Sequence, residues 1–288
     1  MTLKLFDIQR GSLVDGDGIR TTVFFRGCNL RCAWCHNPES QSGEKRFFHY
    51  KEKCVSCGKC DSVCPKNAVK FGTVDYLKCD FCGKCAVCCP QNALKLSGFD
   101  ISENEVMKII LRDKPFYDQS GGGVTFSGGE CMLHYKEVAS LAKQCRDRQI
   151  NVAIDTAGCV PWEHFTCVLP FTDTFLYDVK ILDSEKHKKF IGADNAIILA
   201  NLTKLLDLGA DVIVRIPIIP GINDNEADIA AIRDFLSPYA VRRIELLPYH
   251  RLGENKYRAL GLNPTIFDVP SEEKMSTLKK IVAEKTNL

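Results

Sequence analysis

The sequence lacks the features of membrane and secreted proteins. No apolar run in its 288 residues approaches the ~20 residues that span a bilayer. The N-terminus, MTLKLFDIQRGS, has no apolar stretch of the signal-peptide kind. Charges of one sign do not form blocks, and the formal net charge is only +2, so neither nucleic acid nor a membrane surface is indicated as a partner. We expect a soluble, monomeric, cytoplasmic protein.

Cysteine, in contrast, is abundant. Twelve of the sixteen cysteines lie between Cys28 and Cys89, in three tight groups. Because no signal peptide precedes them, disulfides are not expected. Short repeated steps between cysteines are typical of a metal or inorganic cluster in a reducing compartment. Four cysteines lack such spacing, and we expect them to be buried as small apolar side chains: Cys131, Cys145, Cys159 and Cys167.

An internal duplication contains nine of the grouped cysteines, eight of which follow a repeated pattern. CVSCGKCDSVCP (54–65) and CDFCGKCAVCCP (79–90) share the pattern C-x2-C-x2-C-x3-C-P, followed by Asn-Ala-(Val/Leu)-Lys. The pattern resembles two-cluster ferredoxins, in which the fourth cysteine of each run binds the other cluster. One [4Fe–4S] cluster is thus assigned to Cys54, Cys57, Cys60 and Cys89, and the other to Cys64, Cys79, Cys82 and Cys85. Cys88 is out of register, and zinc is the alternative metal.

The rest of the chain alternates between strand and helix patterns. Segments rich in β-branched and aromatic residues predict strands at residues 21–25, 123–129, 151–158, 174–180, 211–219 and 242–250. Helices are predicted at 101–113, with a Ser102/Glu105 capping box, and at 134–148, 161–169, 184–209 in two pieces, and 225–239. Six β/α units predict an α/β fold, a partial (β/α)6 TIM-like barrel with its chemistry at the carboxyl ends of the strands. We expect this barrel to comprise residues 1–46 and 100–288, with residues 47–99 as a ferredoxin-like insert holding two [4Fe–4S] clusters.

The stretch GCNLRCAWCHNPES (27–40) provides three cysteines where a closed metal site needs four. C-x3-C-x2-C, formed by Cys28, Cys32 and Cys35, would leave one iron of a [4Fe–4S] cluster without a protein ligand. An open metal position is what distinguishes catalytic from structural sites. Here the sequence resembles the radical S-adenosylmethionine (SAM) enzymes, whose open iron is chelated by SAM. A zinc site that borrows a remote cysteine is the alternative.

A closer resemblance extends over nearly the whole chain. DGDGIRTTVFFRGCNLRCAWCHNPES is similar to the signature of the glycyl-radical-enzyme activating enzymes, with Asp17 where that family usually has proline. The resemblance implies an anaerobic enzyme that cleaves SAM reductively and removes hydrogen from a glycine in a C-terminal loop of a partner enzyme. The products are a glycyl radical, 5′-deoxyadenosine and methionine. A flavodoxin or ferredoxin is the implied electron donor, and the insert's clusters are the implied relay.

The resemblance also implies which residues contact SAM. FSGGE, DTAG, YDVK, VRIPIIPGIND and LLPYH match family segments at strand ends. The SAM contacts carried over are Trp34, Cys35, His36, Gly128, Gly129, Glu130, Asp155, Asp178, Val179, Lys180, Arg215 and His250. Gly128, Gly129 and Glu130 would receive the amino group, and Lys180 would pair with the carboxylate. Asp155, Thr156 and Asp178 would line a monovalent cation site, as in some members. Taken singly, such residues often serve solvation or capping instead.

Two other functions remain open from the sequence. A pure electron carrier would need only the duplicated cysteine runs, and it would not cleave SAM. A radical SAM enzyme acting on a small molecule or a ribonucleotide-reductase-type subunit would cleave SAM without placing a stable radical on a glycyl radical enzyme. The sequence does not identify the partner.

Overall fold

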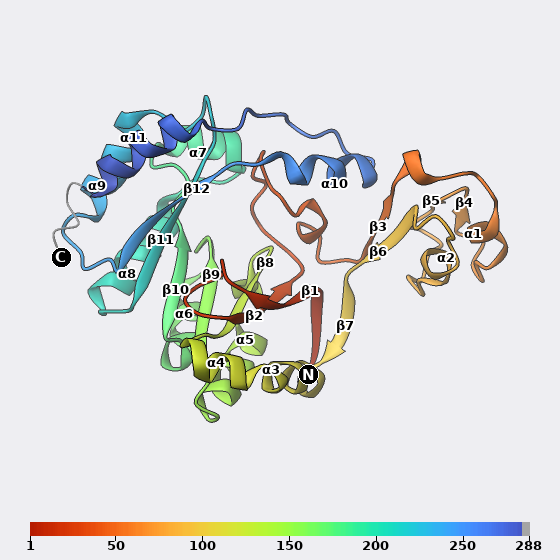
Figure 1. The fold of residues 1–288 in the computed structure, drawn as a ribbon, viewed down its shortest axis with the longest axis horizontal. Coiled ribbons are helices and arrows are strands. Elements are labelled where there is room, and N and C mark those ends of the chain that lie inside the picture. Colours follow the sequence, from red (N-terminus) through yellow and green to blue (C-terminus); the bar gives the residue numbers. More distant parts are fainter. Residues whose placement is uncertain (284–288) are drawn as a thin grey trace.

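The computed structural model describes residues 1–283, in which an eight-stranded sheet forms the centre of the molecule (Figure 1). Its order is β12-β11-β10-β9-β8-β2-β1-β7. The parallel strands are β2 (Arg20–Phe25), β8 (Gly123–Gly128), β9 (Asn151–Thr156), β10 (Thr174–Asp178), β11 (Val212–Ile218) and β12 (Arg243–Pro248). They are the six predicted strands, and the sheet does not close. The partial (β/α)6 barrel is therefore confirmed.

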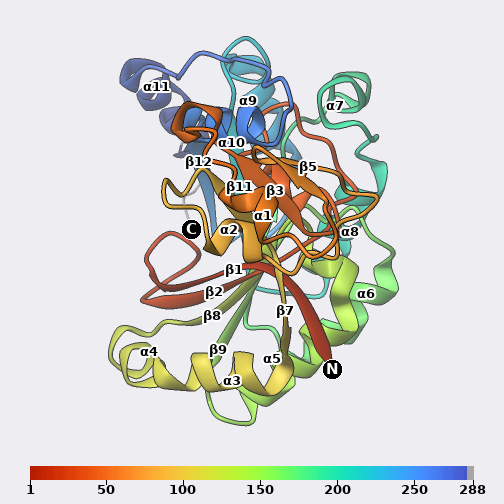
Figure 2. The same cartoon turned by 90° about the vertical axis from the view of Figure 1, so that its right-hand side faces the viewer.

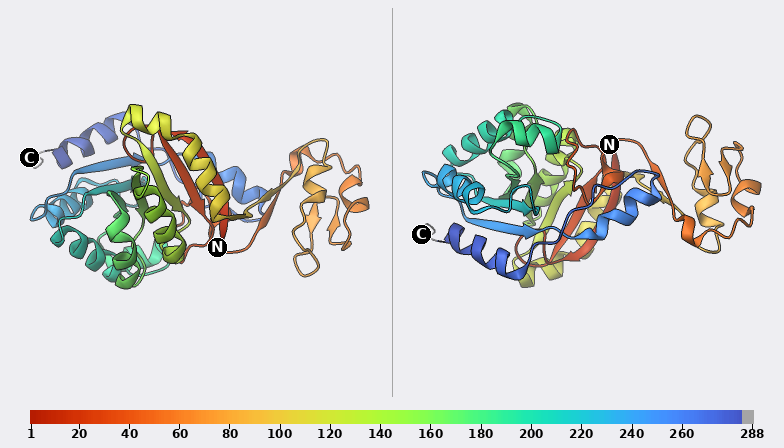
Figure 3. Two further views of the ribbon diagram at one scale, coloured as in Figure 1. Left: turned by 90° about the horizontal axis from the view of Figure 1, so that it is seen from below. Right: turned by 90° about the horizontal axis from the view of Figure 1, so that it is seen from above.

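Helices cover the outer face of this sheet, with the apolar core between the two layers (Figure 3). They are α3 (Glu103–Arg112), α4 (Lys114–Ser120), α5 (Tyr135–Arg146), α6 (Trp162–Val168), α7 (Ser184–Ile191), α8 (Ala196–Asp207), α9 (Glu226–Leu236) and α11 (Glu272–Ala283). A further helix, α10 (Glu254–Ala259), lies beside the cysteine-rich insert and contacts β3 (Arg46–His49). Short 3-10 turns occur at Pro38–Ser40, Lys51–Lys53, Cys131–His134, Leu169–Phe171 and Arg251–Gly253. The predicted capping box at the start of α3 is present, with Ser102 and Glu105 bonded reciprocally. Helices α4, α10 and α11 were not predicted.

Two further strands at the β2 edge were also not predicted. β1 (Thr2–Ser12) pairs antiparallel with β2, and β7 (Phe99–Ser102) pairs antiparallel with β1. The pattern of β1 is weak because only Leu3, Leu5 and Ser12 are buried among its eleven residues. β7 is short and exposed or half-buried throughout. β1 owes its place to pairing with β2 and β7 to pairing with β1, and local sequence patterns do not record such pairing.

The cysteine-rich insert projects away from the barrel on a two-stranded stem (Figures 1 and 2). Its strands β3 (Arg46–His49) and β6 (Leu94–Ser97) pair antiparallel. Beyond them lie α1 (Lys59–Ser62), β4 (Val69–Lys70), β5 (Thr73–Val74) and α2 (Lys84–Val87). The fold is thus a radical-SAM-type partial barrel with a ferredoxin-like insertion. No helix in residues 1–283 has both the length and the apolarity to cross a membrane.

The duplication seen in the sequence is repeated in the backbone of the insert. Ser56, Gly58 and Asn67 have φ of 52°, 70° and 46°. The residues 25 positions later, Phe81, Gly83 and Asn92, have φ of 57°, 75° and 48°. These left-handed conformations are unusual for residues other than glycine, so their recurrence shows that the two halves fold alike.

Candidate active site

A cavity of about 540 Å³ opens at the carboxyl ends of the parallel strands. This volume is in the range of small-molecule sites. Most of the residues predicted to bind the SAM-binding cluster, SAM itself or a monovalent cation line it: Cys28, Cys32, Trp34, Cys35, His36, Gly128, Gly129, Asp155, Thr156, Asp178, Lys180, Arg215 and His250. Glu130 and Val179 do not line it. The six β/α units therefore bring together residues that are spread over more than 200 positions of the sequence.

The three-cysteine loop lies at one wall of this cavity. The backbone N–H groups of Arg31 and Ala33 donate to the carbonyls of Ile191 and Phe190 at the end of α7. These bonds hold the loop against the barrel between β2 and the first 3-10 turn. Apolar packing also holds the loop in place, because Leu30 and Trp34 belong to a small buried apolar cluster. The cysteines are thus held on a rigid support.

The thiols of this loop fit a cationic inorganic group. Burial raises the pKa of Cys28 to about 12 and that of Cys32 to about 11, and it also raises the pKa of Cys35. Buried thiols with such pKa values stay neutral unless iron supplies positive charge beside them. Of the residues lining the cavity, three are cysteines. The donor set therefore suits a cluster bound by three thiolates with one iron left for another ligand.

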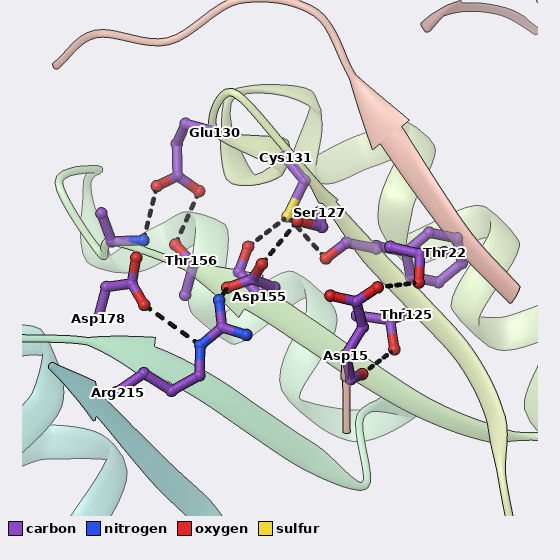
Figure 4. A network of polar contacts seen from close by, with 12 residues as sticks. Asp15, Thr22, Thr125, Ser127, Glu130, Cys131, Asp155, Thr156, Asp178 and Arg215 are labelled. Atoms are coloured by element: carbon purple, nitrogen blue, oxygen red, sulfur yellow. Dashed lines mark hydrogen bonds and ion pairs between the residues drawn. The ribbon is translucent and has the colours of Figure 1, made fainter. Parts of the chain in front are cut away.

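A network of four charged side chains forms the floor of the cavity, and Figure 4 shows three of them, Asp155, Asp178 and Arg215. Arg215 donates from Nη2 to Asp155 Oδ1 at 2.6 Å and from Nε to Asp178 Oδ1 at 3.3 Å. Lys180 Nζ donates to Asp178 Oδ2 at 2.7 Å. Ser127 Oγ donates to the free oxygen of Asp155 at 2.6 Å. Two carboxylates and two cations, from β9, β10 and β11 and the residues that follow, thus balance one another.

Burial and charge act in opposite directions on these groups. Burial alone would raise the pKa of Asp178, but the adjacent Lys180 and Arg215 lower it overall. Burial dominates for Asp155, whose pKa is raised although Arg215 acts against the shift. Burial would lower the pKa of Lys180 and Arg215, but the two aspartates raise both. The two basic groups therefore keep their positive charge at the cavity floor.

The three residues predicted to line a monovalent cation site all have partners within the protein. Asp155 and Asp178 are already paired with Arg215 and Lys180. The hydroxyl of Thr156 donates to Glu130 at 2.7 Å and accepts from the backbone N–H of Gly158. These pairings occupy the three side chains in the structure, and a monovalent cation at this place stays a prediction.

Glu130, which was predicted to take part in binding the amino group of SAM, does not line the cavity. Its side chain is buried outside the cavity, where it accepts hydrogen bonds from Thr156 Oγ1, Met132 N and Ala157 N (Figure 4). Burial raises its pKa to about 7, although these three donors act in the opposite direction. Glu130 therefore anchors the end of β9, and its role toward the amino group of SAM stays a prediction. Val179 is likewise buried, and its backbone N–H donates to the Arg215 carbonyl.

The two glycines before Glu130 are required by packing within the protein. A Cβ on Gly128 would lie 2.2 Å from the carbonyl oxygen of Phe25, and one on Gly129 would lie 2.4 Å from that of Gly27. Gly128 also has φ of 132°, which other residues rarely adopt. The Gly-Gly turn thus lets the end of β8 pass directly against the start of the cysteine loop.

Aromatic side chains line the wall beyond the cysteines. The rings of His36 and His250 stack with centroids 3.7 Å apart and planes at 21°. Burial, and then the proximity of His250, lower the pKa of His36 to about 4. Its Nε2 is buried without a partner in the described residues. Trp34 lines the cavity and packs edge-on against Phe267. The stacking brings together His36 and His250, which the sequence predicted as two separate SAM contacts.

Sequence reasoning missed several cavity residues, of which Asp15 is the most informative. Asp15 Oδ2 accepts from Ser12 and Thr22, and its carbonyl accepts from Thr125 (Figure 4). It belongs to the DGDGIR segment, which was read only as a signature. Asp15 lies two residues before Asp17, in a glycine-rich loop ahead of a strand, and this position could have indicated a site residue. Val14 and Leu247 line the same cavity, but no sequence motif marks them as site residues.

The insert groups its cysteines in the two predicted sets. Cys54, Cys57, Cys60 and Cys89 line one apolar cavity. Burial raises the pKa of Cys79 and that of Cys85, and the nearby Cys64 raises both pKa values further. Cys82 also raises the pKa of Cys79. Among residues 1–283, no three His, Cys, Asp or Glu side chains are grouped as they would be around a single metal ion.

The four remaining cysteines differ in their environments. Cys131 and Cys145 are fully buried, as expected. Cys159 is half-buried, and Cys167 on α6 is exposed, so the expectation of burial is wrong for Cys167. The cause is its place on the solvent side of a short helix, which single-residue propensity does not reveal.

Comparison with known proteins agrees with this site. Residues 76–232 match the radical SAM superfamily, and residues 48–70 match the 4Fe-4S binding domain. The chain is 40% identical over 290 residues to the trans-4-hydroxy-L-proline dehydratase activating enzyme of Clostridioides difficile, covering 98% of this chain and 96% of the relative. It is 38% identical to the choline trimethylamine-lyase activating enzyme of Oleidesulfovibrio alaskensis, covering 96% and 94%.

Other similarities are consistent with these. The benzylsuccinate synthase activating enzyme of Thauera aromatica is 43% identical, covering 88% of this chain and 81% of the relative. A radical SAM methyltransferase from Sphaerobacter thermophilus shares the fold, with a TM-score of 0.56 at 14% identity, covering 99% and 71%. The chain therefore belongs to the glycyl-radical-enzyme activating enzymes, which are oxidoreductases of the radical SAM superfamily that use [4Fe–4S] clusters and SAM.

Proposed function

We propose that this enzyme generates a glycyl radical on a partner enzyme by reductive cleavage of SAM. The observation that carries the proposal is the cavity in which three half-buried cysteines lie beside a floor of paired carboxylates and cations. Cys28, Cys32 and Cys35 would hold a [4Fe–4S] cluster at this cavity. The cluster would supply the one electron needed to split SAM into methionine and a deoxyadenosyl radical, and that radical would take a hydrogen atom from one glycine Cα of the partner to give 5′-deoxyadenosine.

The protein's own residues bind and orient SAM in this proposal. Lys180 and Arg215, which keep their charge at the cavity floor, are suited to the carboxylate of SAM's methionine part. The backbone at Gly128 and Gly129, together with Asp155 and Asp178, is suited to its amino group. The His36–His250 stack and Trp34 offer flat apolar surfaces for the adenine.

We further propose that residues 47–99 form a separate domain with two [4Fe–4S] clusters, which makes three clusters in the enzyme. The cavity with Cys54, Cys57, Cys60 and Cys89 and the group with Cys64, Cys79, Cys82 and Cys85 support this division. These clusters would relay electrons from a flavodoxin or ferredoxin to the SAM-binding cluster. Such clusters are oxygen-sensitive, so the proposed setting is the anaerobic cytoplasm, with the enzyme as a monomer.

The partner is proposed only as a glycyl radical enzyme. The relatives are named for a hydroxyproline dehydratase, a choline lyase and benzylsuccinate synthase, at nearly equal identity to this chain. Similarity therefore does not choose among dehydratases, decarboxylases, lyases and formate-lyases. A stable glycyl-radical EPR doublet on a candidate partner would identify it. Cleavage of SAM with no such doublet on any glycyl radical enzyme would favour another substrate.

The first test is anaerobic reconstitution with iron and sulfide, followed by dithionite, SAM and a chromatographic assay for 5′-deoxyadenosine. We expect about twelve irons per chain, product from the wild type, and none from Cys32→Ala. Cys57→Ala should lose about four irons and keep part of the cleavage, because dithionite bypasses the relay. A wild type that binds the iron but forms no product, with or without a candidate partner, would favour a pure electron carrier.

A further inference from the structure

The two cluster-binding halves of the insert are nearly equivalent, which makes their differences informative. Cys54, Cys57, Cys60 and Cys64 are each repeated 25 positions later, at Cys79, Cys82, Cys85 and Cys89. The residue five positions before each run is also equivalent in the structure. His49 pairs with Leu94 across β3 and β6, and Val74 pairs with Val69 across β4 and β5. Position 49 is thus the counterpart of position 74, but one is histidine and the other is valine.

The imidazole of His49 lies at the wall of the first cluster cavity. His49 lines the same cavity as Cys54, Cys57, Cys60 and Cys89, whose other lining is almost wholly apolar. Its Nε2 is buried and has no hydrogen-bond partner within the described residues. A buried ring N–H without a partner carries a desolvation cost of ~1–3 kcal/mol. The orphaned nitrogen therefore indicates a missing acceptor.

Gly72 shows where this nitrogen lies relative to the cysteines. A Cβ on Gly72 would lie 2.4 Å from His49 Nε2, so only glycine at this position leaves room for the ring. Gly72 lines the first cluster cavity, and its backbone is bonded to the thiol of Cys60. The ring nitrogen is therefore packed against the residue that contacts one cluster ligand.

The second cluster site has no comparable group at the equivalent position. Val74 is half-buried and packs in the apolar cluster that contains Cys64, Cys79 and Cys85. Its neighbours there include Phe47, Phe81 and Leu96. The two sites thus have the same thiol ligands and the same backbone conformation, but only the first has a ring N–H donor at this position.

We propose that His49 donates a hydrogen bond from Nε2 to a sulfur of the cluster bound by Cys54, Cys57, Cys60 and Cys89, and that this bond raises the reduction potential of that cluster above that of the second one. Hydrogen bonds to cluster sulfurs favour the reduced form, because they stabilise the added negative charge. The inference rests on the proposed function, since it requires the two clusters of the insert.

The position of His49 also gives the relay a direction. His49 faces a groove whose other side is formed by Asn255, Arg258 and Ala259, in or at the end of α10. On the same helix, Lys256 Nζ bonds to Glu39 at 2.7 Å, four residues after Cys35. The first cluster site is thus joined to the barrel through α10. One electron at a time would pass from a one-electron donor protein to the second cluster, then to the first, and then to the SAM-binding cluster.

The experiment is an EPR-monitored redox titration of the reconstituted holoenzyme, with iron content measured on each sample. His49→Val gives the first site the residue of the second, and Val74→His is the reciprocal variant. His49→Gln retains an N–H donor. We expect His49→Val to lower the reduction potential of one cluster by about 59 mV, which is about a tenfold change in the equilibrium constant of a one-electron reduction. The other two clusters should be unchanged, and His49→Gln should be intermediate.

The possible results separate the inference from the proposed function. Equal potentials in wild type and His49→Val, at full iron content, would overturn the role of His49 and leave the cluster assignment intact. If His49→Val does not assemble the cluster, Val74→His decides, because a raised potential at the second cluster supports the donor role and an unchanged one overturns it. If Cys57→Ala loses no iron, the cluster assignment in the insert is wrong. That part of the proposed function then fails, and the inference about His49 fails with it.

Discussion

Single buried side chains around the cavity are controlled by partners from other strands. Glu130 follows β8, but its three donors come from the turn after it and from the end of β9. The sequence showed a Gly-Gly-Glu stretch and could not show that the carboxylate turns away from the cavity. The direction of that side chain depends on how β9 is placed beside β8. For the cysteines, in contrast, spacing within one loop already dictated the grouping.

The raised pKa of Glu130 predicts a pH dependence of stability. Its folded pKa of about 7 lies above its ordinary value of 4.5, so the folded state binds the proton more tightly. The contribution of this group to stability therefore falls as pH rises from about 4.5 to about 7. Urea unfolding between pH 5.5 and 8 should show this decline in the wild type and not in Glu130→Gln. The exposed Glu163→Gln should retain it, and identical slopes in all three proteins would contradict the assignment.

The charged floor of the cavity predicts a strong coupling between Arg215 and Asp155. Arg215→Met leaves two buried carboxylates with only Lys180 as a cation, which should cost ~3–5 kcal/mol of unfolding free energy. Adding Asp155→Asn removes one uncompensated charge and should restore part of the loss. The four proteins of this double-mutant cycle can be compared by urea unfolding at pH 7.5. Additive losses would show that the pair at 2.6 Å does not interact energetically.

At the scale of elements, local signals predicted most of the fold. The strands β2 and β8–β12 were found from β-branched runs, and α3 was found from its capping box. Such signals are local because a cap or an apolar run lies within a few residues. β1 and β7 were missed because they are stabilised by pairing at a sheet edge. The internal repeat was visible in the sequence and again in the backbone angles.

The capping box gives a prediction at this scale. Ser102→Ala removes the side-chain acceptor for the Glu105 N–H at the start of α3. We expect a loss of ~1 kcal/mol in unfolding free energy. Ser276→Ala, on the exposed side of α11 where no cap is involved, should change it by less than ~0.5 kcal/mol. Chemical denaturation of both variants beside the wild type tests this, and equal effects would mean that the cap contributes nothing.

At the scale of the whole molecule, the open barrel is held together across its gap. Asp17, in the loop before β2, forms ion pairs with Arg242 and with Arg243 at the start of β12. These residues lie 225 and 226 positions apart in the sequence. They link the first and the last parallel strand of a sheet that does not close. Asp17 is also the position where the signature departs from its family's usual proline.

This connection should make a modest, salt-dependent contribution. Burial would raise the pKa of Asp17, but Arg243 and Arg242 lower it overall. Its stabilisation is therefore present above the ordinary carboxyl pKa and is lost as pH falls through the lowered value. Because the side chains are partly exposed, Asp17→Ala should cost ~1 kcal/mol at low salt and less at 1 M salt. Asp268→Ala, which removes a highly exposed pair with Arg251, should cost almost nothing. Thermal unfolding of both variants provides the measurement.

The sequence by itself determined which cysteines could act together, where the six strands lie and where α3 begins, because ligand spacing, apolar runs and caps operate over a few neighbouring residues. Only the tertiary structure decided that Glu130 faces β9, that His36 stacks on His250, that Arg215 lies between Asp155 and Asp178, and that Asp17 reaches β12. Each of these contacts joins separate β/α units, and their geometry follows from the twist and register of the whole sheet.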